Sequence, residues 1–502
     1  MKRSLFVLPV VFSVLFVYLF HHQQAGVNVL IFNVLLLGIM YFQKRINLKL
    51  RFHIYLLTGS LLSAAMVAIY GAGAALFANI ISLILFSGVL AYPAMVVPLN
   101  AGFSSISAIL TGPFNWIKEL FSVSDAVSRK GRFLRKTGLV VMPLVVFIIF
   151  ILLYSASSPY FNKLTGGVLK SFSKLMQHLS VWISPEAFWL GIAGLFMYFA
   201  YFFGSYNTNL NIFNETQGEN LLRVRKLFSG RITALKTELT SGIILLAFLN
   251  LALAIMNVLD IYHVWLFFEW DGGYLKQFVH EGTWLLIISV LISMVIVIWY
   301  FRGNLNFYSG NKLLIRLSVL WLLQNALLVI SVAIRNIWYI NYFNLAFKRI
   351  WVFAFLILVL IGIITVFIKL RNRKSVQYLL VRNSLFAYGI VLFIGLFNWD
   401  LIVARYNVKH TDSAFFHTDF MMNLNSSTLP VLMLDPQTLN QIDSTRNNFY
   451  PNRHYYVPAQ NFDERIKERT DDYLKGYHKL NWQGKNITDA LTYKRLSEAR
   501  NK

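Results

Sequence analysis

The residues best suited to chemistry gather in one stretch between two apolar segments, Asp260–Thr283. Its candidate catalytic residues are His263, Glu269, Asp271, His280 and Glu281. Two imidazoles and several carboxylates can bind a metal ion or act as acid and base. However, no H-E-x-x-H or similar spacing is present, and the neighbouring Trp265 and Trp270 suit an interfacial aromatic belt. We therefore keep these five residues as catalytic candidates and expect neither a metal site nor a cofactor.

Side-chain amides are the polar groups that remain inside the apolar stretches. Asn250 and Asn257 lie seven residues apart, which places them on one face of a helix. Gln324 and Asn325 lie in the middle of another stretch. These four amides are binding candidates if they line a path for a substrate; the alternative is hydrogen bonding between helices. No charged side chain lies clearly in the middle of a stretch, although ion-coupled transporters usually have some there.

Two arginines come directly after apolar stretches and are further binding candidates. Arg335 and Arg405 could each hold an anionic lipid headgroup or pair with the carboxylates of the Asp260–Thr283 loop. The alternative for both residues is an ordinary position at the membrane surface, with the apolar stem buried and the charge in water.

The elements that position these residues are apolar segments long enough to cross a bilayer, which takes about 20 residues of helix. Only 14% of the 502 residues are charged, against about 25% in a soluble protein. We predict about eleven transmembrane helices within residues 1–401, followed by a soluble tail, 402–502. The predicted spans are Leu5–Phe20, Val27–Phe42, Ile54–Tyr70, Ala74–Val97, Leu139–Ala156, Ala187–Phe203, Leu239–Leu259, Trp284–Phe301, Leu317–Ile334, Ile350–Leu370 and Leu385–Leu401. The fold class is therefore an all-α, polytopic membrane protein.

The distribution of basic residues predicts the orientation of the chain. If the N-terminus is cytoplasmic, twenty-five Lys and Arg fall in cytoplasmic segments and seven fall in segments on the other side. This asymmetry follows the positive-inside rule and places the tail outside the cytoplasm. The net charge of +24 has the same origin, so we expect no binding of nucleic acid. The chain has no cysteine, which excludes disulfides and thiolate chemistry.

The first span has two interpretations, and helices are also predicted in two loops and in the tail. The first span could instead be a signal peptide, although no A-x-A-like cleavage site follows it. Gly166–Ile183 and Ile106–Phe121 have the pattern of helices lying in the membrane surface. In the tail we predict small helices at Phe415–Leu429, Phe462–Leu480 and Ile487–Leu496, with Gln441–Gln460 as a loop.

Five stretches of the chain resemble a bacterial family of uncharacterised polytopic membrane proteins, known only as a domain of unknown function. They are NWDLIVARYN at Asn398–Asn407, YLKQFVHEGT at Tyr274–Thr283, DAVSRKGRFLRKTG at Asp125–Gly138, and the tail segments Tyr473–Trp482 and Asp489–Leu496. The resemblance covers most of the chain and implies a place in the bacterial inner membrane. It also favours a role for Arg405, Tyr406 and Asn407 in docking the tail, but it brings no activity with it.

Three functions remain open at this stage. The first is a scaffold or binding component of an assembly, in which the tail recruits an extracytoplasmic protein or a lipid beyond the bilayer itself. The second is a transporter or lipid translocase that uses the amide face at Asn250 and Asn257. The third is an enzyme on a lipid-linked substrate; it is disfavoured because His21–Gly26, the first outer loop, has no acidic residue. No phosphate-binding G-x-x-x-x-G-K-[ST] loop or G-x-S-x-G motif is present.

Overall fold

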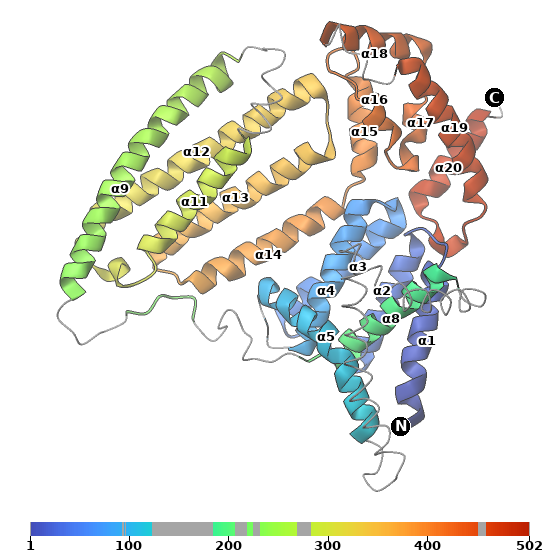
Figure 1. Cartoon of the computed structure of the whole chain (residues 1–502), viewed down its shortest axis with the longest axis horizontal. Helices are drawn as coiled ribbons and strands as arrows, with labels where there is room; N and C mark the ends of the chain where they lie inside the picture. The colour runs from blue at the N-terminus through green and yellow to red at the C-terminus, as the bar shows by residue number, and fades with distance from the viewer. Residues whose placement is uncertain are drawn as a thin grey trace, which may run out of the picture.

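The computed structural model describes residues 2–92, 95, 97–122, 184–205, 218–223, 231–268, 283–449 and 458–500. Within these ranges all the regular elements are helices, and the β-pairing consists of an isolated bridge between Asn220 and Lys374. The all-α prediction is therefore confirmed for the described residues (Figure 1).

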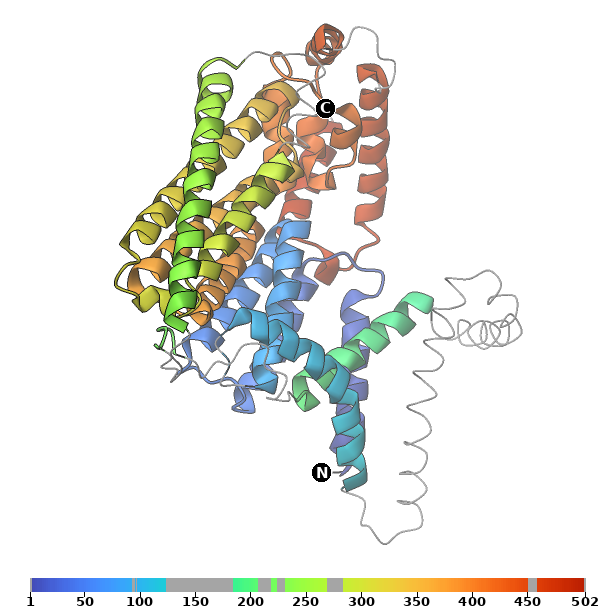
Figure 2. The same ribbon diagram turned by 60° about the vertical axis from the view of Figure 1, so that its left-hand side comes forward.

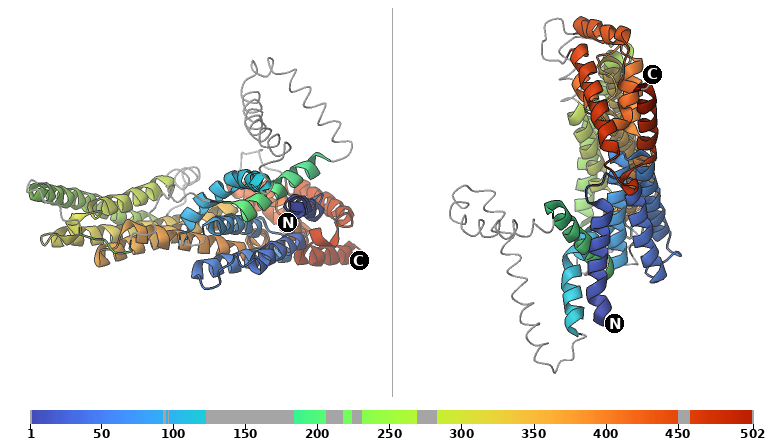
Figure 3. Two further views of the ribbon diagram at one scale, coloured as in Figure 1. Left: turned by 90° about the horizontal axis from the view of Figure 1, so that it is seen from below. Right: turned by 90° about the vertical axis from the view of Figure 1, so that its right-hand side faces the viewer.

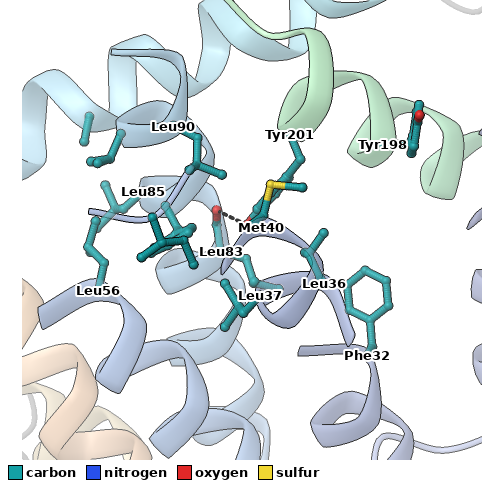
Figure 4. Packing of buried hydrophobic residues seen from close by; sticks show 14 of the residues in the cluster. Phe32, Leu36, Leu37, Met40, Leu56, Leu83, Leu85, Leu90, Tyr198 and Tyr201 are labelled. Atoms are coloured by element: carbon teal, nitrogen blue, oxygen red, sulfur yellow. Dashed lines mark hydrogen bonds between the residues drawn. The ribbon is translucent and has the colours of Figure 1, made fainter. Parts of the chain in front are cut away.

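The described residues of the N-terminal half form a first bundle of six helices. They are α1 (Lys2–Phe20), α2 (Val27–Phe42), α3 (Arg51–Tyr70), α4 (Gly73–Ala91), α5 (Pro98–Ser122) and α8 (Pro185–Phe203). Their shared core consists of large apolar side chains from every helix, such as Phe32, Met40 and Leu56 (Figure 4). Tyr201 of α8 is 2% exposed, and its hydroxyl donates a hydrogen bond to the Leu83 carbonyl oxygen at 2.7 Å.

A second bundle follows, in which α9, α12 and α13 are longer than any helix of the first. It consists of α9 (Arg231–Asp260), continued by a π-helical turn (Ile261–Leu266), and of α11 (Thr283–Tyr300), α12 (Lys312–Phe343), α13 (Phe347–Asn372) and α14 (Val376–Gly395). Figure 2 shows α9 running beside α12, and these two helices are in extensive contact. Helix α14 joins the bundles, because Leu379 packs in the second core whereas Tyr388 packs in the first.

Seven of the described helices are long and apolar enough to cross a membrane. They are Arg51–Tyr70, Gly73–Ala91, Pro185–Phe203, Leu235–Leu266, Lys312–Phe343, Phe347–Asn372 and Val376–Gly395, and shorter apolar helices cover Val7–Phe20, Val27–Phe42 and Leu285–Tyr300. The predicted span Leu139–Ala156 and the surface helix Gly166–Ile183 lie outside the described residues, so the count of about eleven stays a prediction. The other surface candidate, Ile106–Phe121, lies within α5, which packs along α4 and α8.

The tail has short helices and its own apolar core. Its elements are α15 (Trp399–Lys409), α16 (Thr418–Met422), α17 (Leu429–Leu432), α18 (Pro436–Phe449), α19 (Ala459–Tyr477) and α20 (Ile487–Arg500). Phe462 and Ile466 of α19 are fully buried against Phe416 and Leu429.

Two of the predicted tail helices are confirmed: Phe462–Leu480 corresponds to α19 and Ile487–Leu496 to α20. The single helix predicted at Phe415–Leu429 is wrong, because the chain there forms α16 and a separate 3-10 turn.

The loop prediction for Gln441–Gln460 is also wrong in part, because α18 extends to Phe449. Its sequence is polar, so hydropathy gave no helical signal. The helix begins at Pro436 after Asp435, whose carboxylate accepts a hydrogen bond from the Thr438 N–H at 2.6 Å. Proline in the first turn and an acidic side chain before it are both helix-start signals.

Figure 1 shows the tail helices grouped beside the ends of α12, α13 and α3. We call the helix ends that lie on this side the tail end, and the other ends the opposite end. The right-hand view of Figure 3 shows the N-terminus far from the tail, at the end of α1 that points away from it. Helix α4 begins at the tail end, and α8 also begins there.

Candidate functional site

The turn between α1 and α2 is hydrogen-bonded to the tail. The Gln483 side chain donates to the Tyr18 carbonyl oxygen at 2.8 Å, and the Val27 N–H donates to the Lys485 carbonyl oxygen at 3.1 Å. Gly26 allows this approach, because a Cβ there would lie 2.4 Å from the Lys485 carbonyl oxygen. The end of the chain is therefore held against its first hairpin.

The turn between α3 and α4 makes a second contact with the tail. The Thr488 hydroxyl donates to the Ile69 carbonyl oxygen at 2.8 Å. Gly71 ends α3 in the left-handed region, at φ +60, and a Cβ on it would lie 2.3 Å from the Asn486 Nδ2. Glycine is required here for both conformation and space.

The turn between α12 and α13 makes the third contact, with α15 and the loop after it. The Leu345 N–H donates to Asn407 Oδ1 at 2.8 Å, and Asn407 Nδ2 donates to the Leu345 carbonyl oxygen at 3.0 Å. The Phe415 N–H donates to the Tyr342 carbonyl oxygen at 2.8 Å. These three turns are ones that the charge pattern predicts on the tail's side of the membrane.

A pocket of about 540 Å³ lies where the tail meets the helix ends. It is lined by Ala72, Gly73, Ala74, Phe77, Phe347, Ile350, Trp351, Ile394, Trp399, Asp400 and Asn425. Its wall is mostly apolar and carries two tryptophans, and Asp400 supplies a carboxylate. One oxygen of that carboxylate accepts a hydrogen bond from the Asn425 N–H at 3.0 Å. Pockets that bind small ligands have this size and this mixture of an apolar wall with a few polar groups.

Gly73 leaves this pocket open, because nothing lies within 4 Å of the position that its Cβ would take. Phe77 and Trp351 meet edge to face, with ring centroids 6.4 Å apart, and both are more than 40% exposed. The Trp399 indole N–H is already used, since it donates to the Ile394 carbonyl oxygen at 2.8 Å. The second oxygen of Asp400, for which the structure shows no hydrogen bond, is therefore a polar group that a ligand could meet.

An ion pair is buried between α9 and α12 near the tail end. The carboxylate of Asp260 pairs with the guanidinium of Arg335, and both side chains are at most 6% exposed. The Ser331 hydroxyl donates to the second Asp260 oxygen at 2.6 Å. Arg335 is therefore not exposed as expected, because α12 continues to Phe343 and this side chain packs against α9. Pairing with a carboxylate of the 260–283 region was one of the roles considered for Arg335 from the sequence.

The four amides of the second bundle hydrogen-bond between or along helices. Asn250 Nδ2 donates to the Leu317 carbonyl oxygen at 3.1 Å, and its Oδ1 accepts from Gln324 Nε2 at 2.8 Å. Asn257 Nδ2 donates to the Gln324 carbonyl oxygen at 3.2 Å. Asn325 Nδ2 donates within α12, to the Trp321 carbonyl oxygen at 2.7 Å. These contacts hold α9 against α12 and favour the interhelical explanation.

Two buried basic residues of α13 were not singled out from the sequence. Lys369 is 1% exposed, and its ammonium group donates to the Phe301 carbonyl oxygen at 2.7 Å. Arg349 is 9% exposed and donates to the Phe343 carbonyl oxygen at 2.8 Å. Arg349 directly precedes the predicted span Ile350–Leu370, and Lys369 is the last residue but one of that span. The signal available was their position within one helical turn of the ends of that span.

The remaining site candidates are dispersed. Glu269, Asp271, His280 and Glu281 lie outside the described residues, while His263 is exposed and stands edge-on to Tyr262 at 4.9 Å. Arg405 is exposed on α15, and Tyr406 stacks on His410 at 4.2 Å. Among the described residues, His21, His22 and Glu186 form a group that could hold a metal ion. One potential ligand atom from each lies within 4.8 Å of the other two.

The helices, their length and their apolar surfaces define an integral membrane protein of the α-helical class. The model of the family described as Domain of unknown function (DUF4153) matches residues 31–433, which include all of the second bundle and most of the first. The chain belongs to this family. No curated protein and no solved structure matches the chain.

Proposed function

We propose that this protein is a binding component of the bacterial cytoplasmic membrane, and that it holds a phospholipid in the pocket between tail and helix ends. The observation that carries the proposal is the composition of this pocket. Helix ends from both bundles supply its apolar wall, and α15 and the loop at Asn425 supply its polar rim.

The arrangement suits an amphiphile at the membrane surface. Tryptophan side chains are enriched where hydrocarbon meets headgroups, and Trp351 and Trp399 both line the pocket. The apolar wall would take the glycerol and upper acyl region. The available Asp400 oxygen would accept a hydrogen bond from an ammonium headgroup such as that of phosphatidylethanolamine, because a charged donor and a carboxylate form the stronger kind of hydrogen bond.

The orientation in this proposal puts the tail outside the cytoplasm. It is supported by the basic residues at the opposite end, where Arg45 donates to the Tyr201 carbonyl oxygen, and where Lys374 and Arg382 flank Glu219. Cationic loops of this kind are retained in the cytoplasm.

The test uses the full-length protein in bilayer nanodiscs with a photoactivatable phosphatidylethanolamine. Gly73→Trp should fill the pocket without a steric clash at its Cβ and should reduce crosslinking at least fivefold. Gly38→Trp is the matched control, because a Cβ at that helical glycine also meets nothing within 4 Å and the site is not part of the pocket. Equal crosslinking of Gly73→Trp and the native protein would reject the proposal.

A second variant tests the headgroup. Asp400→Asn keeps the acceptor for the Asn425 N–H but removes the charge. The native protein should capture phosphatidylethanolamine in preference to phosphatidylglycerol, and Asp400→Asn should lose this preference. A preference that survives the substitution would remove Asp400 from the site.

The alternative of a transporter or lipid translocase has weaker support. Its motive was the amide face of α9, and Asn250 and Asn257 both donate to backbone carbonyls of α12. For the alternative of an enzyme on a lipid-linked substrate, four of the five candidate residues lie outside the described part of the chain.

A further inference from the structure

Two adjacent imidazoles and one carboxylate meet at the tail end of the first bundle. His21 and His22 follow α1, and Glu186 lies in the first turn of α8. One potential ligand atom from each of the three residues lies within 4.8 Å of the other two. This group differs from the loop candidates of the 260–283 region and from the lipid pocket.

Close packing of α1 against α8 brings the three side chains together. The Ser13 hydroxyl donates to the Gly191 carbonyl oxygen at 2.8 Å. A Cβ on Gly194 would lie 2.9 Å from the Phe16 Cβ, so the glycine lets the two helices approach closely. The end of α1 and the start of α8 are therefore held at a short distance, and the cluster forms between them.

The backbone conformation at His22 brings the two imidazole rings side by side. His22 has φ 54, in the left-handed region that non-glycine residues seldom adopt. With this turn the two ring centroids lie 3.9 Å apart although the residues are neighbours in sequence. A strained conformation at a group of metal-ligating side chains is a common feature of functional sites.

Further contacts orient the candidate ligands. His22 Nδ1 lies 2.7 Å from one Glu186 oxygen, and the His22 N–H donates to the other oxygen at 3.1 Å. His21 Nε2 lies 2.6 Å from the Ser184 hydroxyl oxygen, and that hydroxyl also accepts from the Ala187 N–H at the start of α8. The Ser184 contact is an outer contact of the kind that selects the imidazole tautomer and orientation in metal sites.

We propose that His21, His22 and Glu186 bind a divalent transition-metal cation of the zinc class. Two imidazoles and a carboxylate form a donor set that suits Zn²⁺ and leaves a coordination position open for water or another ligand. The His22–Glu186 contact alone does not explain the arrangement, because the two side chains are 69% and 45% exposed and exposed ion pairs add little stability. Glu186 also places a carboxylate beside the turn between α1 and α2, His21–Gly26, which has no acidic residue of its own.

The experiment measures zinc bound to the full-length protein, purified in detergent with an affinity tag free of histidine. Equilibrium dialysis against micromolar zinc, with the metal counted by mass spectrometry, should give about one equivalent for the native chain. His22→Gln and Glu186→Gln should each lower the bound zinc at least tenfold at the same free concentration. His478→Gln, in which an exposed tail histidine is removed, is the matched control and should retain the full equivalent.

A measurement on the native chain keeps the test decisive if a variant unfolds. Cobalt should bind in place of zinc and give visible absorption bands typical of a low-coordinate nitrogen and oxygen site, and added zinc should abolish these bands. The proposal is overturned if the native chain retains no zinc, or if zinc binding is the same in Glu186→Gln as in the native protein.

Discussion

The side-chain amide of Asn407 pairs with both backbone polar groups of Leu345, at 2.8 and 3.0 Å. The two residues lie 62 positions apart and belong to the tail and to the turn between α12 and α13. Asn407 is 2% exposed, so water has little access to its amide. The Asn407 side chain thus satisfies both backbone hydrogen-bonding groups of Leu345 and connects the tail to the second bundle.

Replacing Asn407 by Leu should detach the tail locally, because two partly buried backbone groups of Leu345 would lose their partner. An unsatisfied buried group costs about 1–3 kcal/mol, so we expect a loss of about 2–4 kcal/mol in the free energy of unfolding. Denaturation in mild detergent would measure it. The neighbouring, exposed Lys409→Ala should change stability by less than about 0.5 kcal/mol. An equal effect of the two variants would contradict the role assigned to Asn407.

The Asp260–Arg335 pair should tolerate loss of both partners better than loss of one. Asp260→Leu or Arg335→Met alone leaves an unpaired buried charge, with an expected cost of about 3–5 kcal/mol. The double variant should recover most of that loss. A double-mutant cycle of unfolding free energies measures the coupling. Additive effects would mean that the two groups act independently.

Titration of Asp489 should make the docked tail more stable in mild acid than at neutral pH. Burial raises the pKa of this carboxyl from 3.8 to about 6, against the opposing hydrogen bond from Asn486. The folded state therefore binds the proton more tightly, so the stabilisation present below pH 4 is lost as pH rises through 6. Two pKa units correspond to roughly 3 kcal/mol.

Thermal unfolding between pH 4.5 and 7.5 checks this prediction. Asp489→Asn cannot titrate, so its unfolding temperature should fall less with rising pH than that of the native protein. At pH 7.5 the variant should be at least as stable as the native protein, because it buries no charge. An unchanged pH slope in the variant would assign the dependence to another group.

Close approach of α4 and α5 depends on Gly88. A Cβ at this position would lie 1.9 Å from the Ala101 carbonyl oxygen and 2.9 Å from the Ser105 nitrogen, both backbone atoms that cannot turn aside. Gly88→Ala should therefore separate the helices at a cost of about 3 kcal/mol. Gly38→Ala, with no atom within 4 Å of its Cβ, should be neutral or slightly stabilising. Unfolding temperatures of the two variants, compared in the same detergent, provide the measurement.

The absence of native cysteine allows a direct test of orientation. Glu498 in the tail and Lys49 at the opposite end are both exposed, so Glu498→Cys and Lys49→Cys should be reactive. In intact spheroplasts a membrane-impermeant maleimide should label position 498, and position 49 should react only after lysis. The reverse pattern would place the tail in the cytoplasm.

The sequence predicts the individual helices well because a membrane span needs a long apolar run. The predicted span Ile350–Leu370 lies within α13, and the amide face of α9 was visible in the spacing of Asn250 and Asn257. Arg335 was misplaced because α12 is longer than the hydrocarbon thickness requires, and hydropathy does not show where such a helix ends. Apolar length indicates a span, but it does not say how far the helix continues beyond it.

The candidate sites were less predictable because their members come from distant parts of the chain. His22 and Glu186 are 164 positions apart, so no local spacing reveals their contact. The same holds for the lipid pocket, whose lining runs from Ala72 to Asn425. Such sites follow from the packing of helix ends, and a single sequence carries little information about that packing.

The contacts between the tail and the first hairpin impose an order on biosynthesis. Gln23 and Tyr18 form hydrogen bonds with Asn481 and Gln483, which lie 458 and 465 positions further along the chain. At about 5–20 residues per second, the ribosome needs roughly 25–90 s to reach them. During that interval the first turn is available to chaperones and insertion factors. Docking of Asn481 and Gln483 ends this access, so the turn after α1 stays uncovered until this part of the tail has been made.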